Sequence, residues 1–301
     1  MGKRGKSVST IIYAQNYSLM ELMAAAIARE FRDQETAFVG VGPPLIAAMV
    51  AKLTDAPNLT IAVEGGTIGS SPRRLLTCIA DTTICERAYS CGTMWRNFGD
   101  QQRGFYDVGV IGGAQIDKYG NVNATALGDY NRPSVRVAGS GGANDIGSSV
   151  GRYSVMMRQE KRRFVERVDY LTVPGYLDGG DARIKAGLPG GGPHGVITTM
   201  GIFRFDEESG EMYLDKCHPG ITPEKVKENV GWDLKMAPSI GTTEPPTQEQ
   251  VEIMRVLDPY GLYLGSGREG MGDVEKGFDF YMEVLDKSYD AMTELFRQKG
   301  L

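Results

Sequence analysis

A single carboxylate stands where a short apolar segment ends. Residues 59–63 read Leu-Thr-Ile-Ala-Val, which predicts a buried strand, and Glu64 follows directly. Gly65 and Gly66 come next, and residues without side chains let a substrate approach the backbone closely. A desolvated carboxylate is a nucleophile for an acyl carbon, including that of a thioester. Glu64 is therefore the candidate catalytic residue. From its position alone, the alternative is a solvated residue that begins a turn.

A second glycine-rich segment could serve the same reaction. The loop Gly139–Asp145 reads Gly-Ser-Gly-Gly-Ala-Asn-Asp and follows a predicted strand at 134–138. When a nucleophile attacks an acyl group, the oxyanion that forms needs hydrogen-bond donors already in place, and the backbone N–H groups of such a loop can supply them. The alternative interpretation is an ordinary turn from a strand into a helix.

The surrounding pattern predicts the elements that carry these two segments. Capping boxes at Ser18–Glu21 and Thr247–Gln250 mark two helix starts, and Pro43-Pro44 marks a third. Helices are expected at 19–31, 45–53, 73–81, within 87–103 and up to 257, and strands at 36–41, 59–63, 106–111, 134–138, 153–157, 168–173, 196–205 and 212–214, with a turn in "DKYGN" between two further short strands. Strands that alternate with helices predict an open, mostly parallel α/β sheet flanked by helices. Ligands bind beyond the carboxyl ends of such strands, which is where Glu64 lies.

The last part of the chain has a different pattern. Apolar residues recur there at steps of three and four, which predicts one apolar stripe along a helix: Val274, Phe278, Tyr281, Leu285, Tyr289, Met292 and Phe296. The stripe either docks on its own domain or contacts another subunit. We therefore divide the chain into one α/β domain, residues 1–265, and a C-terminal amphipathic helical extension, residues 266–301.

Composition excludes several classes of protein. The net charge of −5 and the pI of about 5.3 argue against a nucleic-acid-binding protein. No apolar run approaches the roughly 18 residues of a membrane span, and no signal-type apolar core follows the basic first residues. The 4 cysteines form no C-x-x-C pair and there are only 2 histidines, so no metal site is expected. Free thiols in such a chain favour a cytoplasmic location.

Several longer motifs occur in a specific order. They are "VEGG" at 63–66, "GGAQIDKYGNVNAT" at 112–125, "GDYNRP" at 128–133, "GSGGAND" at 139–145 and "QEKRRFVERVDYLTVPG" at 159–175. With these motifs the chain resembles the β subunit of glutaconate CoA-transferase and other β-type subunits of family I CoA-transferases. The resemblance extends from Phe38 to Pro259, and the motifs are long and ordered enough to make it specific.

The resemblance implies an α/β fold of the CoA-transferase type and a ping-pong reaction. In that reaction a glutamate attacks acyl-CoA, giving first an acyl anhydride and then a glutamyl-CoA thioester, and CoA moves to a free acid, with dicarboxylic acids among the candidates. By motif position the nucleophile is Glu64, and the oxyanion-hole amides are those of Gly141 and Gly142. Weaker candidates for the substrate and CoA pocket are Gly65, Gly66, Gly113, Gln115 and Asp129. No tightly bound cofactor is implied, since coenzyme A enters as part of the acyl-CoA substrate.

The resemblance also implies a separate α-type subunit, because this chain matches only the β half of a two-chain enzyme. Many family I enzymes have Ser-Glu-Asn-Gly at the nucleophile, whereas this chain has Val63-Glu64-Gly65-Gly66, which leaves the acid substrate open. Relatives of this fold include hydrolases that open steroid rings on CoA thioesters, as well as decarboxylases, and those lack the nucleophilic glutamate. The alternatives to a transferase are thus a CoA-thioester or ring-cleavage hydrolase and a non-catalytic subunit that completes a partner's site.

Overall fold

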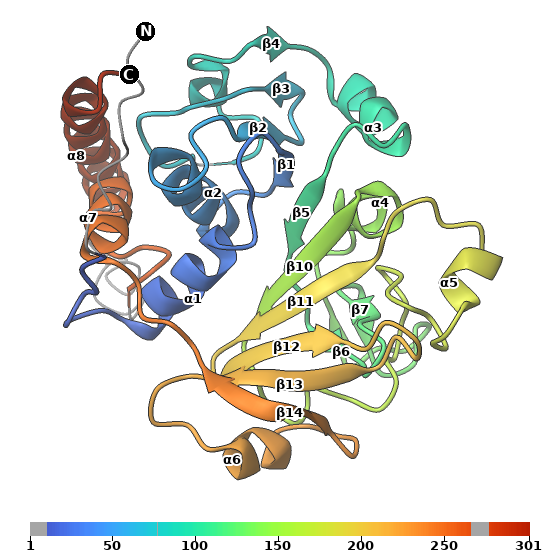
Figure 1. The fold of residues 1–301 in the computed structure, drawn as a ribbon. Coiled ribbons are helices and arrows are strands. Elements are labelled where there is room, and N and C mark those ends of the chain that lie inside the picture. Colours follow the sequence, from blue (N-terminus) through green and yellow to red (C-terminus); the bar gives the residue numbers. More distant parts are fainter. Residues whose placement is uncertain (1–10, 77, 266–276) are drawn as a thin grey trace, which may run out of the picture.

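The computed structural model describes residues 11–76, 78–265 and 277–301 of the 301-residue chain (Figure 1). The helices of this part are α1 (Leu19–Ala28), α2 (Pro43–Leu53), α3 (Met94–Gln102), α4 (Ala143–Ser149), α5 (Ala182–Lys185), α6 (Pro223–Glu228), α7 (Gln248–Leu257) and α8 (Gly277–Gln298), with a 3-10 turn, η1, at Thr82–Cys85. The strands are β1 (Thr36–Val39), β2 (Thr60–Val63), β3 (Thr67–Ile68), β4 (Ser90–Cys91), β5 (Val108–Ile111), β6 (Gln115–Ile116), β7 (Val122–Asn123), β8 (Ala126–Leu127), β9 (Val135–Arg136), β10 (Arg152–Met157), β11 (Pro193–Thr198), β12 (Gly201–Phe205), β13 (Met212–Cys217) and β14 (Lys235–Thr242).

The predicted open α/β sheet is confirmed. Within the described residues, ten strands form one sheet in the order β14-β13-β12-β11-β10-β5-β1-β2-β3-β4. Its centre, β11-β10-β5-β1-β2, is parallel throughout, and antiparallel strands continue it on both sides. The chain adds β2 on one side of β1 and later adds β5 on the other side. The strand order therefore reverses between β1 and β5, and a ligand crevice is expected at such a switch point.

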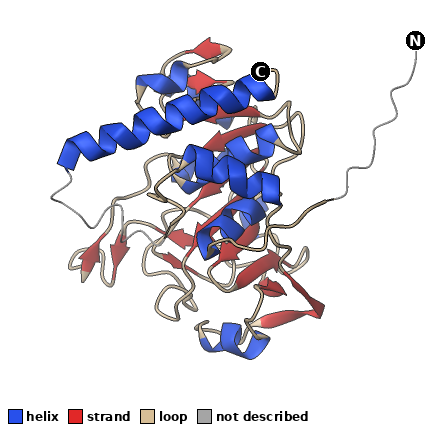
Figure 2. Ribbon diagram, turned by 90° about the vertical axis from the view of Figure 1, so that its left-hand side faces the viewer, coloured by secondary structure: helices blue, strands red, loops and turns tan. Residues whose placement is uncertain are grey.

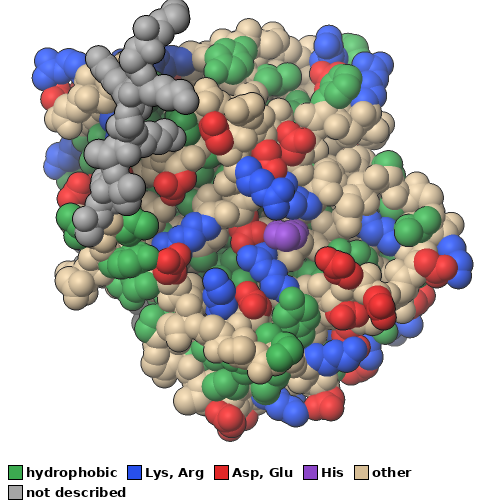
Figure 3. All heavy atoms as spheres, in the orientation of Figure 1, with side chains coloured by type: hydrophobic (Ala, Val, Ile, Leu, Met, Phe, Trp, Pro, Cys, Tyr) green, Lys and Arg blue, Asp and Glu red, His purple; other side chains and the backbone are tan. Residues whose placement is uncertain are grey.

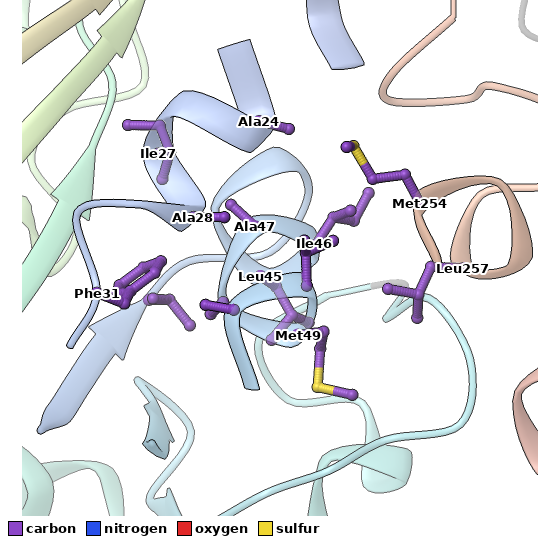
Figure 4. Close-up of a cluster of buried hydrophobic side chains, with 14 of the residues drawn as sticks. Ala24, Ile27, Ala28, Phe31, Leu45, Ile46, Ala47, Met49, Met254 and Leu257 are labelled. Carbon is purple, nitrogen blue, oxygen red and sulfur yellow. The ribbon is translucent and has the colours of Figure 1, made fainter. Parts of the chain in front are cut away.

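Hydrophobic layers cover both faces of the sheet because alternate strand residues point in opposite directions. On β1, Ala37 and Val39 belong to the core beneath α1, α2, α7 and α8, while Phe38 belongs to the core beneath α4. Figure 4 shows the first core, where α1, α2 and α7 meet through side chains that include Ile27, Ile46 and Met254. Figure 1 shows the two sets of helices on opposite sides of the sheet.

The predicted helix starts agree with the structure. Ser18 and Glu21 form a complete capping box at the start of α1, and Thr247 and Gln250 form another at the start of α7. Pro43 begins α2. The first N–H groups of a helix have no partner within it, so the missing N–H of proline costs no hydrogen bond there. Of these three helices, α2 begins directly after the end of β1.

Two element predictions were wrong. The described residues of the range 73–81, where a helix was expected, form no helix. Arg73 pairs with Glu86 and Arg74 pairs with Asp81, and these ion pairs hold the segment in an irregular conformation. The expected strand at 168–173 is reduced to one isolated bridge between Val122 and Val173. The Asp169 side chain instead accepts hydrogen bonds from the Gly128 backbone and the Gln115 amide, which holds this segment as a loop.

The C-terminal helix α8 packs on its own domain. Leu285, Met292 and Phe296 are buried in the core beneath α1, α2 and α7, and the Ser288 hydroxyl donates to the carbonyl of Leu257 at 2.9 Å. Figure 2 shows α8 lying along the layer of helices. Val274 and the start of the predicted extension at 266 lie outside the described residues, so the division of the chain at 265 stays a prediction.

Charged side chains are mixed on the surface. On the face shown in Figure 3, Lys and Arg side chains lie among Asp and Glu side chains. Arg204 pairs with Glu30 at 2.6 Å, and Arg152 pairs with Glu35 at 2.7 Å, which ties β12 and β10 to the segment between α1 and β1. In the described part of the chain, no helix combines the length and apolar character needed to cross a membrane.

Candidate active site

Glu64 follows the last residue of β2, at the carboxyl edge of the parallel sheet. The strand end is held by α3, because the Asn97 side-chain amide donates a buried hydrogen bond of 2.7 Å to the carbonyl of Val63. The Tyr106 hydroxyl in turn donates to the Asn97 side-chain oxygen. Burial of the Tyr106 phenol raises its pKa to about 12, so it remains a neutral donor at physiological pH. This chain of contacts fixes the backbone from which the Glu64 side chain projects.

Gly65 and Gly66 are required by the protein's own packing. A Cβ on Gly65 would collide with the carbonyl oxygen of Ile79. Gly66 has φ +107°, and a Cβ there would lie 2.6 Å from the carbonyl oxygen of Gly92. These two glycines therefore form the tight turn between β2 and β3, a role that is separate from the access for substrate that the sequence suggests.

The glycine-rich loop meets Glu64 through Gly142. Gly142 is the N-cap residue of α4, and a Cβ built on it would lie 3.4 Å from the Glu64 carboxyl carbon and 3.0 Å from the ring of Phe98. Gly141 has φ +47°, a left-handed conformation that favours glycine. Within the described part of the chain, neither Gly141 nor Gly142 donates a hydrogen bond through its backbone N–H. Two backbone N–H groups without an acceptor among the described residues thus lie in a loop in which a side chain on Gly142 would meet the carboxyl group of Glu64.

The environment of Glu64 disfavours its charge. Partial burial raises the pKa of the Glu64 carboxyl group above its usual range, and the nearby Asp145 carboxylate raises it further. Asp145 lies in the first turn of α4 and accepts a hydrogen bond of 3.2 Å from the Gln102 side chain. A partly desolvated carboxylate is a stronger nucleophile than a fully hydrated one, which suits Glu64 to covalent catalysis.

The weaker candidates form a separate set of contacts. A Cβ on Gly113 would collide with Val122, so this glycine is needed for packing. The buried Gln115 side chain bridges Asn123 and Asp169, at 2.8 and 2.9 Å. The Asp129 carboxylate accepts from the Asn131 backbone at 2.7 Å, as in a local turn. No contact in the described structure joins these three residues to Glu64, and their part in a substrate pocket stays a prediction.

The sequence did not reveal Asn97, Phe98 and Tyr106. Asn97 and Tyr106 support the end of β2 and Phe98 lies by Gly142, but all three come from α3 and the segment before β5, which are distant from Glu64 in the sequence, and no local motif marks them. Only the structure shows that Asn97 and Asp100 are buried on the inner face of α3, where buried polar residues normally have a specific partner.

The fold is an open α/β sheet with a carboxylate beside a glycine-rich loop at its carboxyl edge, where α/β proteins of this kind bind their ligands. Comparison with known families identifies the class of enzyme to which such a chain belongs. The family model described as "Coenzyme A transferase" matches residues 20–229. Because this match covers well over half of the chain, the chain belongs to the coenzyme A transferase family. The resemblance seen in the sequence motifs is thereby confirmed.

Within this family the chain is similar to B-type subunits. It is 39% identical over 259 residues to the B subunit of glutaconate CoA-transferase from Acidaminococcus fermentans, covering 83% of this chain and 96% of that protein. It is 38% identical over 245 residues to the B subunit of 3-oxoadipate CoA-transferase from Pseudomonas knackmussii, covering 80% and 94%. The crystal structure of the Acidaminococcus enzyme superposes with a TM-score of 0.79, covering 84% of this chain and 99% of the matched chain. A cholesterol ring-cleaving hydrolase IpdB subunit of Rhodococcus jostii is 30% identical over 226 residues, covering 73% and 83%.

Proposed function

We propose that this chain is the catalytic B-type subunit of a CoA-transferase that moves CoA from an acyl-CoA to a free carboxylic acid through a glutamyl-CoA thioester on Glu64. The observation that supports this most is that Gly142 lies next to the Glu64 carboxyl group, since a Cβ on Gly142 would be 3.4 Å from the carboxyl carbon, and that the N–H of Gly142 has no hydrogen-bond acceptor among the described residues. A nucleophile and an oxyanion donor must lie close together for acyl transfer. Here β2 supplies the first and the start of α4 supplies the second.

The proposed steps conserve atoms and charge. A Glu64 carboxylate oxygen attacks the thioester carbonyl, and the C–S bond breaks to give an acyl-glutamyl anhydride and CoA thiolate. The thiolate attacks the Glu64 carbonyl carbon, which forms glutamyl-CoA and releases the acyl group as a carboxylate. The acceptor carboxylate then attacks the glutamyl-CoA thioester, which gives a second anhydride and CoA thiolate. The thiolate attacks the acyl carbon of the acceptor, which releases the new acyl-CoA and restores the Glu64 carboxylate. Each addition places negative charge on a carbonyl oxygen, which the Gly141 and Gly142 amides stabilise.

We further propose that the site is completed by an α-type subunit. The relatives described above are named as B subunits, and the described residues of this chain do not enclose Glu64, which is only partly buried. The purified chain alone is expected to show little or no CoA transfer, and activity should appear when the α-type chain is added. Full ping-pong transfer by this chain alone would contradict the shared site.

The test of covalent catalysis traps the intermediate. The assembled enzyme is incubated with acyl-CoA and then treated with borohydride, and the modified peptide is identified by mass spectrometry. A reduced or CoA-bearing Glu64 is expected, and Glu64→Gln should lose on the order of 10³-fold or more in kcat, since it lacks the nucleophile. Full activity in a Glu64→Gln protein verified as not deamidated would exclude this mechanism and favour a non-catalytic role.

A hydrolase is the second candidate because one relative is named as a ring-cleaving hydrolase. The two activities differ in their dependence on an acceptor. A transferase forms a new acyl-CoA only when a second carboxylic acid is present. A thioester hydrolase releases free CoA with water alone, and a ring-cleaving hydrolase adds water across a C–C bond of the acyl group and leaves the CoA thioester intact. Conversion of acyl-CoA that is independent of added acid, with either stoichiometric free CoA or a ring-opened acyl-CoA as product, would replace the transferase proposal with the hydrolase.

A further inference from the structure

Most of the cysteines in this chain lie exposed in one segment, between β3 and α3. They are Cys78, Cys85 and Cys91, whereas Cys217 is buried. Cysteine is among the residue types most often found buried, so several exposed thiols within one short segment are unusual. The acyl-transfer steps proposed above give none of these thiols a part.

Cys85 and Cys91 are brought together by a tight turn. Cys85 is the last residue of η1, and the Ala88 N–H donates to its carbonyl at 3.2 Å. Arg87, inside the turn, has φ +57°, and β4 with Cys91 follows directly. Partial desolvation and a hydrogen bond to the Cys91 thiol both raise the pKa of Cys85. The two thiols are therefore close enough to interact.

The segments that carry these thiols contact the turn that follows Glu64. The Gly92 N–H, next to Cys91 in the chain, donates to the Gly66 carbonyl at 2.8 Å. A Cβ on Gly66 would lie 2.6 Å from the Gly92 carbonyl oxygen, so this contact has no spare room. On the other side, Gly65 lies against the carbonyl of Ile79, in the segment that leads into η1. The position of β4 relative to η1 is thus coupled to the backbone beside the nucleophile.

The strand that carries Cys91 is weakly held. β4 consists of Ser90 and Cys91, both exposed, and it lies at one end of the sheet (Figure 1). Among the described strands it pairs with β3 alone. A segment with one neighbour and little burial opens at a low free-energy cost. β4 can therefore move when a new link pulls on it.

We propose that Cys85 and Cys91 are a redox-sensitive dithiol, which a peroxide oxidises to a disulfide that displaces β4 and the turn after Glu64. An S–S bond is about 2.05 Å long, shorter than any contact between two separate thiols, so η1 and β4 must move toward each other. The disulfide itself is independent of the proposed transferase function, and only its effect on CoA transfer rests on that function.

The proposed oxidation balances with one hydrogen peroxide. The sulfur of one cysteine attacks a peroxide oxygen, the O–O bond breaks, and a sulfenic acid and one water form. The sulfur of the other cysteine then attacks the sulfenic sulfur, the S–O bond breaks, and a second water leaves as the disulfide forms. Each cysteine loses one electron and its thiol proton, and the peroxide gains both electrons and both protons.

The first test maps the disulfide in the full-length chain. The chain is treated with one equivalent of hydrogen peroxide, and its intact mass should fall by the mass of two hydrogen atoms. Trypsin cleaves at Arg87, between the two cysteines, so Cys85 and Cys91 fall in the separate peptides 75–87 and 88–96. Without reduction these peptides should remain joined, and dithiothreitol should separate them.

Cys78→Ser is the matched control, because Cys78 is also exposed and shares peptide 75–87 with Cys85. This variant should still give the joined peptides after peroxide, and Cys85→Ser should not. Absence of joined peptides in the wild type would overturn the proposal. Joined peptides in Cys85→Ser that disappear in Cys78→Ser would also overturn it, since they would assign the link to Cys78.

The second test measures the effect on the site. The oxidised chain is freed of peroxide, assembled with the α-type subunit and assayed for CoA transfer with and without dithiothreitol. Transfer should fall at least about tenfold and return on reduction, because a misplacement of about 1 Å can cost about 10²-fold. Cys85→Ser should keep its activity after the same treatment. A disulfide with unchanged transfer would overturn the coupling to Glu64. A disulfide in a chain that shows no transfer even when reduced would reject the transferase function and keep the dithiol.

Discussion

The Glu64 carboxyl group must be ionised to act as a nucleophile, yet its surroundings favour the protonated form. Partial burial and the Asp145 carboxylate both raise its pKa. The acid limb of the pH profile of kcat/KM, which reports ionisations in the free enzyme, should therefore lie above the ordinary glutamate value of about 4.3. Asp145 is the one neighbouring charge identified as a cause, which makes its contribution separable by mutation.

We predict that Asp145→Asn moves this acid limb to lower pH. Removing a neighbouring negative charge makes ionisation of Glu64 easier, so activity should persist further into the acid range. The measurement is kcat/KM against pH for both proteins. Asp181→Asn, in which an exposed carboxylate paired with Lys185 is replaced, is the matched control and should leave the limb in place. An unchanged or upward-shifted limb in Asp145→Asn would contradict the electrostatic assignment.

The same raised pKa predicts a pH-dependent effect of Glu64→Gln on stability. The folded protein binds the Glu64 proton more tightly than the unfolded chain, so this contribution to stability is present below about pH 4.3 and is lost as the pH rises through the folded pKa. Ionised Glu64 therefore disfavours folding at neutral pH, and glutamine removes that cost. Urea unfolding should show Glu64→Gln to be more stable than the wild type at pH 7, with the difference shrinking at pH 4. A difference independent of pH would count against this interpretation.

At the scale of elements, the site is a junction of β2, α3 and α4. Asn97 of α3 holds the carbonyl of Val63, and Phe98, the next residue, lies against Gly142 at the start of α4. The Phe98 ring also packs at 5.8 Å from Phe38 of β1, measured between ring centroids. Helix α3 thus lies between the end of β2 and the glycine-rich loop, and a change in the spacing between α3 and α4 should alter the position of Glu64.

We predict that Gly142→Ala lowers turnover more than it lowers stability. The backbone of Gly142 is helical, with φ −77°, so alanine causes no strain, but its Cβ would press on Phe98 at 3.0 Å and on the Glu64 carboxyl carbon at 3.4 Å. The loop amides would then be displaced from the oxyanion, where loss of one donor costs about 10²–10³ in kcat. Phe98→Leu in the same protein makes room and should restore part of the activity. Normal kcat in a folded Gly142→Ala enzyme would show that the loop is only a turn.

Local patterns revealed much of this fold, and contacts between distant segments account for what they missed. The strand before Glu64, the capping boxes of α1 and α7, and the turn of "DKYGN" depend on neighbouring residues, and all agree with the structure. Strand β14 was not expected, because Pro238 and Gly241 interrupt its pattern; such residues are tolerated at an edge, where the strand lies. The Asn97–Val63 bond joins residues 34 positions apart, so no local pattern could show it.

At the scale of the whole molecule, the described part of α8 closes the helical layer of its own domain. Val284 and Met292 are fully buried, and Arg73 and Arg87 lie over the rings of Tyr289 and Phe296, at 4.5 and 5.0 Å from the ring centroids. These arginines belong to the segment between β2 and α3, so α8 also supports the loop that follows the Glu64 turn. Among the described side chains of the apolar stripe, Leu285, Met292 and Phe296 thus have their partners within the chain.

Two methionines on α8 allow a matched test of this packing. Met292 is 0% exposed and Met282 is 38% exposed, so the same substitution probes the inner and outer faces of one helix. Met292→Ala should lower the free energy of unfolding by about 2–5 kcal/mol, because it removes a buried side chain and leaves a cavity. Met282→Ala should change it by about 0.5 kcal/mol or less. Denaturant unfolding measures both values. Equal effects of the two variants, or unchanged unfolding in Met292→Ala together with weaker assembly with the α-type chain, would mean that the stripe serves another chain instead of its own domain.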